Sequence, residues 1–125
     1  MTPEWFESRA WIWLHYAVVK LGRGELFEAM GMLSFFREQV LGPMLYRRAN
    51  LPQRGVPRIE CHNIDPEGLL NSTLATHDRE SVSIAIRKAV DAYSNLRADA
   101  LPENIADDTA RRALLAMLKA YSERV

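Results

Sequence analysis

Cysteine, net charge and long apolar runs are all scarce in this sequence. The 125 residues include one cysteine, Cys61, which cannot form an internal disulfide, and the first residues do not have the basic and apolar pattern of an export signal. We therefore expect a reducing, cytoplasmic environment. Sixteen basic residues balance sixteen acidic ones, which excludes the strong net field that draws a whole protein to nucleic acid or to anionic membranes.

Membrane spans and strands also lack support in the pattern. The longest apolar stretch, residues 10–19, is interrupted by His15 and is about half of the roughly 20 residues that a membrane span requires. No segment alternates apolar and polar residues for long enough to predict a sheet. With 48% hydrophobic and 26% charged residues, the sequence is typical of one soluble domain over residues 1–125, with no membrane association.

The first predicted helix covers residues 3–21 and is apolar on every side. Thr2 is a candidate N-cap, Pro3 suits the first turn, and Gly22 suits the end. Because a surface helix keeps one polar side, we expect other helices or a second polypeptide to cover this one. One stripe comprises Phe6, Ala10, Leu14, Ala17 and Leu21; a second face comprises Trp5, Trp13 and Tyr16 with Arg9 and Lys20; a third comprises Trp11 and His15.

Further amphipathic segments complete an all-α fold. The second helix begins near Glu25, after a tight turn, and is broken or kinked at Gly42-Pro43. Residues 50–63 are a long irregular connection, and Asp65 caps a short helix that continues through Leu74. Two more helices run from Asp78 towards residue 102, and from Asp107 or Asp108 to the end. We predict an up-and-down bundle of four main helices plus a short connecting helix.

Each of these main helices has an apolar stripe at helical spacing, which predicts its buried side. In the second helix the stripe is Leu26, Met30, Leu33, Val40 and Met44, widened by Phe27, Phe35 and Phe36; in the next it is Val82, Ile86, Ala89, Tyr93 and Leu96; in the last it is Ala110, Leu114, Leu118, Tyr121 and Val125.

Arginines gather in one part of an otherwise balanced chain. Between Gln39 and Ile59 there are four arginines and no acidic residue. Guanidinium groups match phosphate oxygens bidentately, and a glycine in the loop lets backbone amides approach an anion. The segment is thus either an anion-binding loop or a solvated basic loop, and its arginines are Arg47, Arg48, Arg54 and Arg58.

Other groups of reactive residues are weaker candidates for a catalytic or metal-binding site. Arg9 and His15, with five residues between them, match a loose pattern of dimeric helical ribonucleases, but on a helix they point roughly 120° apart. Cys61-His62 lacks a second pair of metal ligands, and Asp78 after His77 is better placed to cap a helix than to act in acid–base chemistry. No phosphate-binding or dinucleotide fingerprint occurs. We predict no metal and no cofactor.

Several segments resemble the C-terminal helical half of bacterial nucleotidyltransferase-like proteins, akin to the aminoglycoside and lincosamide nucleotidyltransferases. The resemblance lies in residues 5–11, His15-Tyr16, residues 20–29, Leu41-Gly42-Pro43 and residues 53–60, and it is sharpest over 20–25, Lys-Leu-Gly-Arg-Gly-Glu. In that family a sheet-containing N-terminal domain carries the metal-binding acids, and the helical bundle that follows completes the substrate pocket. This sequence lacks the catalytic half.

The resemblance implies a non-catalytic substrate-binding or accessory domain. Its partner would be a nucleotidyltransferase catalytic domain or subunit. The chain would form a homodimer or a heteromer, and it would bind a nucleotide or a small molecule. A dimeric ribonuclease and a plain oligomerisation module are the alternatives. The residues expected nearest the ligand are Arg9, Tyr16, Lys20, Arg23, Glu25 and Glu28.

Overall fold

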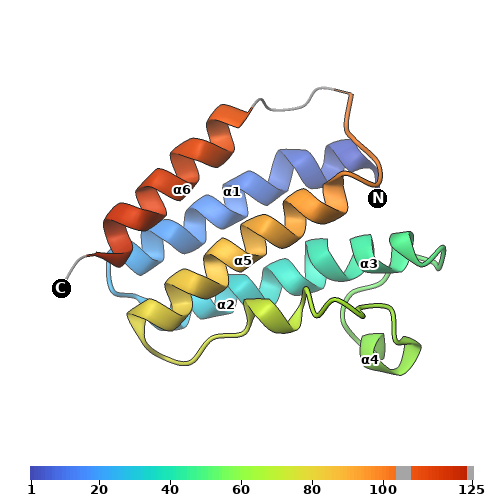
Figure 1. Cartoon of the computed structure of the whole chain (residues 1–125), viewed down its shortest axis with the longest axis horizontal. Coiled ribbons are helices and arrows are strands. Elements are labelled where there is room, and N and C mark those ends of the chain that lie inside the picture. The colour runs from blue at the N-terminus through green and yellow to red at the C-terminus, as the bar shows by residue number, and fades with distance from the viewer. Residues whose placement is uncertain (104–107, 124–125) are drawn as a thin grey trace.

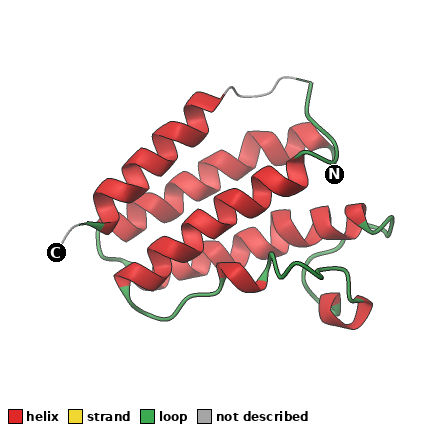
Figure 2. Cartoon of the chain, viewed as in Figure 1, coloured by secondary structure: helices red, strands yellow, loops and turns green. Residues whose placement is uncertain are grey.

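The computed structural model describes residues 1–103 and 108–123, and these residues form helices without any strand (Figures 1 and 2). The predicted all-α bundle of four main helices is confirmed. The first is α1 (Pro3–Gly22). The second is the continuous run of α2 (Leu26–Phe36), the π-helical turn η1 (Arg37–Leu41) and α3 (Gly42–Arg48), and the last two are α5 (Arg79–Arg97) and α6 (Asp108–Ser122). The short α4 (Ile59–His62) and the 3-10 turn η2 (Asn71–Thr73) lie in the connection before α5.

Two predicted helix starts are confirmed by their caps. The Thr2 hydroxyl accepts a hydrogen bond from the Trp5 amide at 3.1 Å, and the Asp78 carboxylate accepts one from the Ser81 amide at 2.8 Å. Each side chain satisfies an amide that the first helical turn leaves without a partner. Asp107, one of the two candidate caps of the last helix, lies outside the described residues, as does Val125.

Helix α1 packs against α2, α5 and α6, and Figure 1 shows it between α6 and the remaining helices. All five residues of its main apolar stripe are buried, with at most 1% of their surface exposed. Trp5, Trp11 and Trp13 are partly buried and pack against the same core. The prediction that other helices cover this helix is confirmed for these sides, whereas Ile12 (66% exposed) and Tyr16 (39% exposed) lie on a side that the described residues leave open.

Arg79, the first residue of α5, holds the ends of two other helices together. Arg79 donates from Nη1 to the carbonyl oxygens of Leu21 at 3.1 Å and Tyr121 at 3.0 Å, near the ends of α1 and α6. Both carbonyls lie near helix C-termini, where a positive charge is favourable, so one guanidinium stabilises both ends. Gly22 lies close by, and a Cβ there would come within 2.6 Å of the Tyr121 ring.

The stripe predicted for the second helix is only partly right. Leu33, Val40 and Met44 are buried, whereas Phe27 and Phe35, expected to widen the stripe, are 80% and 43% exposed. They lie beside the packed side of α2 rather than on it, and Phe35 still contacts the Trp13 ring of α1. The stripe predicted for the helix after Asp78 is buried throughout, and Leu114 and Leu118 are the buried members of the last one.

Helical structure does not stop at Gly42-Pro43 but changes type ahead of it. Pro43 has no amide hydrogen for an α-helical bond, and the five residues of η1 form a wider π-turn in which the Gly42 amide binds the Arg37 carbonyl. Gly42 also lets the following loop approach the helix, because a Cβ there would lie 2.8 Å from the Gly55 carbonyl oxygen. The helix therefore does not break at Gly42-Pro43; its hydrogen-bond pattern changes there, and it continues as α3.

The short helix expected from Asp65 through Leu74 is wrong. Only Asn71–Thr73 is helical there, as a 3-10 turn. The Asp65 carboxylate accepts hydrogen bonds from the amides of Leu69 at 2.8 Å and Leu70 at 2.9 Å, four and five residues ahead, and so closes a loop instead of capping a helix. The connection predicted as irregular over 50–63 contains the single turn α4, after Arg58 in a left-handed conformation (φ 65°).

Among the described residues, no helix has the length and apolar character needed to cross a membrane.

Candidate functional site

The turn between α1 and α2 brings together five of the six side chains predicted to bind substrate. The Tyr16 hydroxyl donates to the Glu28 carboxylate at 3.0 Å, and the Lys20 ammonium lies 3.4 Å from the Glu25 carboxylate. Arg23 lies 3.9 Å from the same Glu25 oxygen. We call these five residues the turn cluster. It is a balanced, exposed group of two cations, two carboxylates and a phenol, and its weak ion pairs can exchange partners at little cost.

Tyr16 is held neutral within this cluster. Its hydrogen bond to Glu28, together with partial desolvation and the negative charge of that carboxylate, raises the pKa of the phenol above its ordinary value. Lys20 lies over the ring, with Nζ 5.3 Å from its centre. The ring thus already has a cation on its face, a geometry that also suits a flat cationic or aromatic group of a ligand.

Arg9, the sixth predicted residue, lies apart from the turn cluster. Its guanidinium is 4.3 Å from the centre of the Trp5 ring and donates to the Trp5 carbonyl oxygen at 3.2 Å and to the Ser8 hydroxyl at 3.2 Å. Seven residues of helix separate Arg9 from Tyr16, a rise of roughly 10 Å. Arg9 is therefore placed on the same side of α1 but near its beginning.

Aromatic side chains border the turn cluster along α1 and α2. Phe27 is 80% exposed and packs on His77, with ring centres 4.3 Å apart and ring planes tilted by 39°, while the partly exposed Phe35 meets Trp13 edge to face at 4.9 Å. A cavity of about 380 Å³ lies at the turn, between Phe27, His77 and the two carboxylates of the cluster. We call Phe27, Phe35 and Tyr16 the aromatic border. Such exposed aromatic groups are characteristic of surfaces that bind partners.

The four loop arginines do not form one patch. Arg47 donates to the Leu96 carbonyl at 3.1 Å, and Arg48 pairs with Asp99 at 2.7 Å, so both hold the end of α5. The bond from Arg48 keeps the pKa of Asp99 below its ordinary value. Arg54 and Arg58 are exposed, and in the described part of the chain neither side chain forms an ion pair. Only these two are open to an anion.

The remaining reactive residues are dispersed. Arg9 lies on Trp5, whereas the exposed His15 borders a cavity of about 300 Å³ between α1 and α6, next to Trp11. Cys61 is exposed, and the residues that the structure describes contain no group of three potential metal ligands. Asp78 is an N-cap, as predicted, and its neighbour His77 packs on Phe27.

A buried polar cluster inside the bundle was not predicted. The Tyr93 hydroxyl donates to Glu7 Oε1 at 2.5 Å, and Arg97 lies 3.6 Å from Glu7 Oε2. Burial is the main cause that raises the pKa of Tyr93 far above its ordinary value, and the hydrogen bond to Glu7 is the second cause. Glu7 is 8% exposed and Tyr93 is fully buried. The cluster joins α1 to α5 and is enclosed by the bundle, which makes it a stabilising element of the fold.

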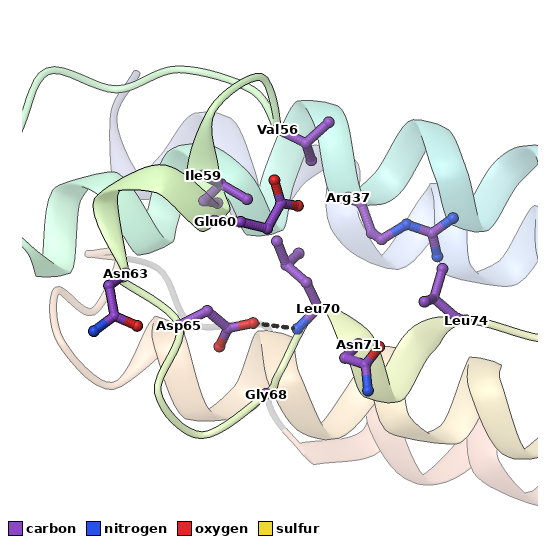
Figure 3. A pocket seen from close by; sticks show the side chains of 10 residues that line it. All are labelled: Arg37, Val56, Ile59, Glu60, Asn63, Asp65, Gly68, Leu70, Asn71 and Leu74. Carbon is purple, nitrogen blue, oxygen red and sulfur yellow. Dashed lines mark hydrogen bonds between the residues drawn. The ribbon is translucent and has the colours of Figure 1, made fainter.

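The sequence also gave no indication of a cavity of about 430 Å³ beside η1 (Figure 3). Arg37 enters it from the π-turn, while Glu60 and Asp65 approach from the long connection. Apolar side chains between these polar groups include Ile59, Leu70 and Leu74. A π-turn frequently marks a functional position, and Pro43 was the one signal in the sequence that it would form here.

The turn cluster and the cavity beside η1 are thus two places where polar groups converge on an accessible space. Both offer charged and polar groups that could bind a ligand. No family model, no curated protein and no solved structure matches this chain.

Proposed function

We propose that the chain is a non-catalytic helical accessory domain that docks on a nucleotidyltransferase catalytic domain and helps to bind its nucleotide or small-molecule ligand. The observation that carries the proposal is the convergence of Tyr16, Lys20, Arg23, Glu25 and Glu28 at the α1–α2 turn. This is the segment in which the resemblance to the nucleotidyltransferase-like proteins is sharpest.

The charges of the turn cluster suit a phosphate-bearing ligand. Lys20 and Arg23 share one carboxylate, Glu25, at distances of 3.4 and 3.9 Å. These long, exposed contacts contribute little to stability, so a phosphate can take the place of the carboxylate beside the cations. The Tyr16 ring and the nearby Phe27 offer surfaces on which a flat base can stack.

The aromatic border supports docking of a second polypeptide. Phe27 and Phe35 expose 80% and 43% of their surface, and Tyr16 exposes 39%. Aromatic side chains are enriched in interfaces because they bury a large area with little loss of conformational entropy. Their position beside the charged turn would place the ligand at the junction of the two domains, where binding clefts commonly occur.

The ribonuclease alternative has less support from the geometry. Arg9 is bound to Trp5 and Ser8, whereas His15 lies beside the cavity between α1 and α6. General acid–base catalysis requires both groups within reach of the same phosphodiester. We expect no RNA cleavage by the purified chain; cleavage that His15→Ala abolishes without loss of fold would contradict the accessory role.

Docking is tested by purifying the chain together with the nucleotidyltransferase catalytic domain that its gene or an adjacent gene encodes. We expect a complex in analytical ultracentrifugation that Phe27→Ser and Phe35→Ser weaken. The matched control is Ile84→Ser, which changes an exposed apolar residue on α5. The proposal is wrong if no such catalytic domain is encoded there, or if all three variants bind as the unmodified chain does.

A further inference from the structure

The cavity beside η1 holds a cation without an ionic partner. Arg37 is half-buried, and its guanidinium donates only from Nη1, to the Thr73 carbonyl oxygen at 2.9 Å and to the Thr73 hydroxyl at 3.0 Å. Among the described residues it forms no ion pair with a carboxylate. Burial lowers its pKa from the ordinary arginine value, yet the group stays charged. A charge in this setting is stabilised by an anionic ligand group.

Two carboxylates also border the cavity, and only one of them is already used. Asp65 accepts hydrogen bonds from the Leu69 amide and from the Leu70 amide, of which Figure 3 draws the second, so its charge holds the loop closed. Glu60 is exposed, and no described group donates to its carboxylate or pairs with it. The two ionised groups that remain open are thus one guanidinium and one carboxylate, whose charges cancel.

Apolar surface lies between these open groups. Figure 3 shows Arg37 entering from the helix, Glu60 from the turn that follows Val56, and Leu70 between them. The volume of about 430 Å³ falls within the range of roughly 300–1,000 Å³ that small-molecule sites occupy. A small molecule that carries a carboxylate, an ammonium group and an apolar side chain would complement each of these walls.

We propose that this cavity binds a small zwitterionic molecule of the amino-acid type, with its carboxylate on Arg37, its ammonium facing Glu60 and its apolar body against Ile59, Leu70 and Leu74. The site is separate from the turn cluster, and it is present in the chain alone. Its occupation does not depend on a catalytic partner, so this proposal and the accessory role stand or fall independently.

The test compares three probes with one apolar skeleton. L-leucine carries both charged groups, 4-methylpentanoate lacks the ammonium, and isopentylamine lacks the carboxylate. Binding to the purified chain is followed by nuclear magnetic resonance as shifts of the Leu70 and Leu74 methyl signals. We expect L-leucine to bind more tightly than either single-charge probe. The proposal is overturned if L-leucine causes no shifts at millimolar concentration, or if it binds no better than 4-methylpentanoate.

Two variants test the contacts of the ligand's carboxylate and of its ammonium group separately. Arg37→Met should weaken L-leucine and 4-methylpentanoate roughly tenfold or more, since it removes charge-assisted hydrogen bonds, and should leave isopentylamine unchanged. Glu60→Gln, at an exposed position, should weaken L-leucine and isopentylamine but not 4-methylpentanoate. Arg87→Met and Glu67→Gln alter exposed residues outside the cavity and serve as controls. Equal losses for all three probes would indicate a merely structural role and would overturn the assignment.

Discussion

Two tyrosine–glutamate hydrogen bonds in this protein differ mainly in burial, and replacing each tyrosine by phenylalanine isolates that difference. Tyr93 donates to Glu7 at 2.5 Å within the bundle, and Tyr16 donates to Glu28 at 3.0 Å on the surface. Both substitutions remove one hydroxyl and keep the ring. Any difference in the free energy of unfolding therefore reports what burial adds to the same bond.

The structure predicts a large effect at Tyr93 alone. Tyr93 is fully buried and Glu7 is 8% exposed, so Tyr93→Phe leaves a carboxylate oxygen that water cannot readily solvate. Hydrogen bonds to charged groups contribute about 1.5–3 kcal/mol, and we expect the unfolding free energy to fall by that amount. Arg97, 3.6 Å from the other Glu7 oxygen, limits the loss because it still offsets the charge. At Tyr16, water replaces the lost donor, and we expect no change beyond experimental error.

Urea denaturation at neutral pH, followed by circular dichroism, measures both variants. The reasoning is refuted if Tyr93→Phe is as stable as the unmodified protein, or if Tyr16→Phe loses as much stability as Tyr93→Phe. A second measurement uses pH. Because the fold raises the pKa of the Tyr93 phenol, this group stabilises the protein fully below its unfolded pKa of about 10, and the contribution is lost as pH rises beyond that value. The stability gap between the unmodified protein and Tyr93→Phe should therefore narrow above pH 10.

Two further predictions concern helix packing and acid stability. Gly22→Ala should destabilise the protein by about 1–3 kcal/mol because the new Cβ would lie 2.6 Å from the Tyr121 ring. Gly31→Ala, whose Cβ would have nothing within 4 Å, should stabilise the protein by about 0.5–1 kcal/mol. Urea denaturation measures both variants, and changes in unfolding free energy of the same sign would contradict the packing. Arg48 lowers the pKa of Asp99, so this carboxylate stabilises the fold above its unfolded pKa of about 3.9 and ceases to do so as pH falls. Between pH 6 and pH 3, the unfolding free energy of Asp99→Asn should therefore fall less than that of the unmodified protein. An equal fall in both proteins would refute the assignment.

Local patterns predicted the helices because the forces that form them act over a few residues. Thr2 and Asp78 cap helices with amides three positions away, and the stripe from Phe6 to Leu21 is set by helical spacing. Periodicity shows which residues share a face, but not whether a neighbour covers that face. Phe27 was therefore misjudged as part of the core.

The connection before α5 shows the same limit for polar residues. Asp65 is an acceptable N-cap by sequence, yet its carboxylate binds two amides four and five residues ahead, and a loop forms. Gly55 lies against Glu38, which binds the Val56 amide at 2.9 Å and fixes this loop on the π-turn. Contacts of this kind depend on where two distant segments meet.

The turn cluster could be predicted because its members lie within 13 residues of each other in sequence, on two helices joined by a glycine turn. The groups that sequence reasoning missed or misjudged have distant partners. Glu7 meets Tyr93 across 86 positions, and Arg48 meets Asp99 across 51, so an arginine of α3 that was a candidate anion ligand instead holds a helix end.

The most direct test of the accessory role is the affinity of the complex with the catalytic domain for ATP and magnesium, measured by isothermal titration calorimetry. We compare Lys20→Ala/Arg23→Ala in the turn cluster with Arg87→Ala/Lys88→Ala, which removes two exposed cations of α5. The account predicts that the first pair weakens ATP binding at least tenfold and that the second pair leaves it unchanged. Equal affinity for the unmodified complex and both variants would contradict it.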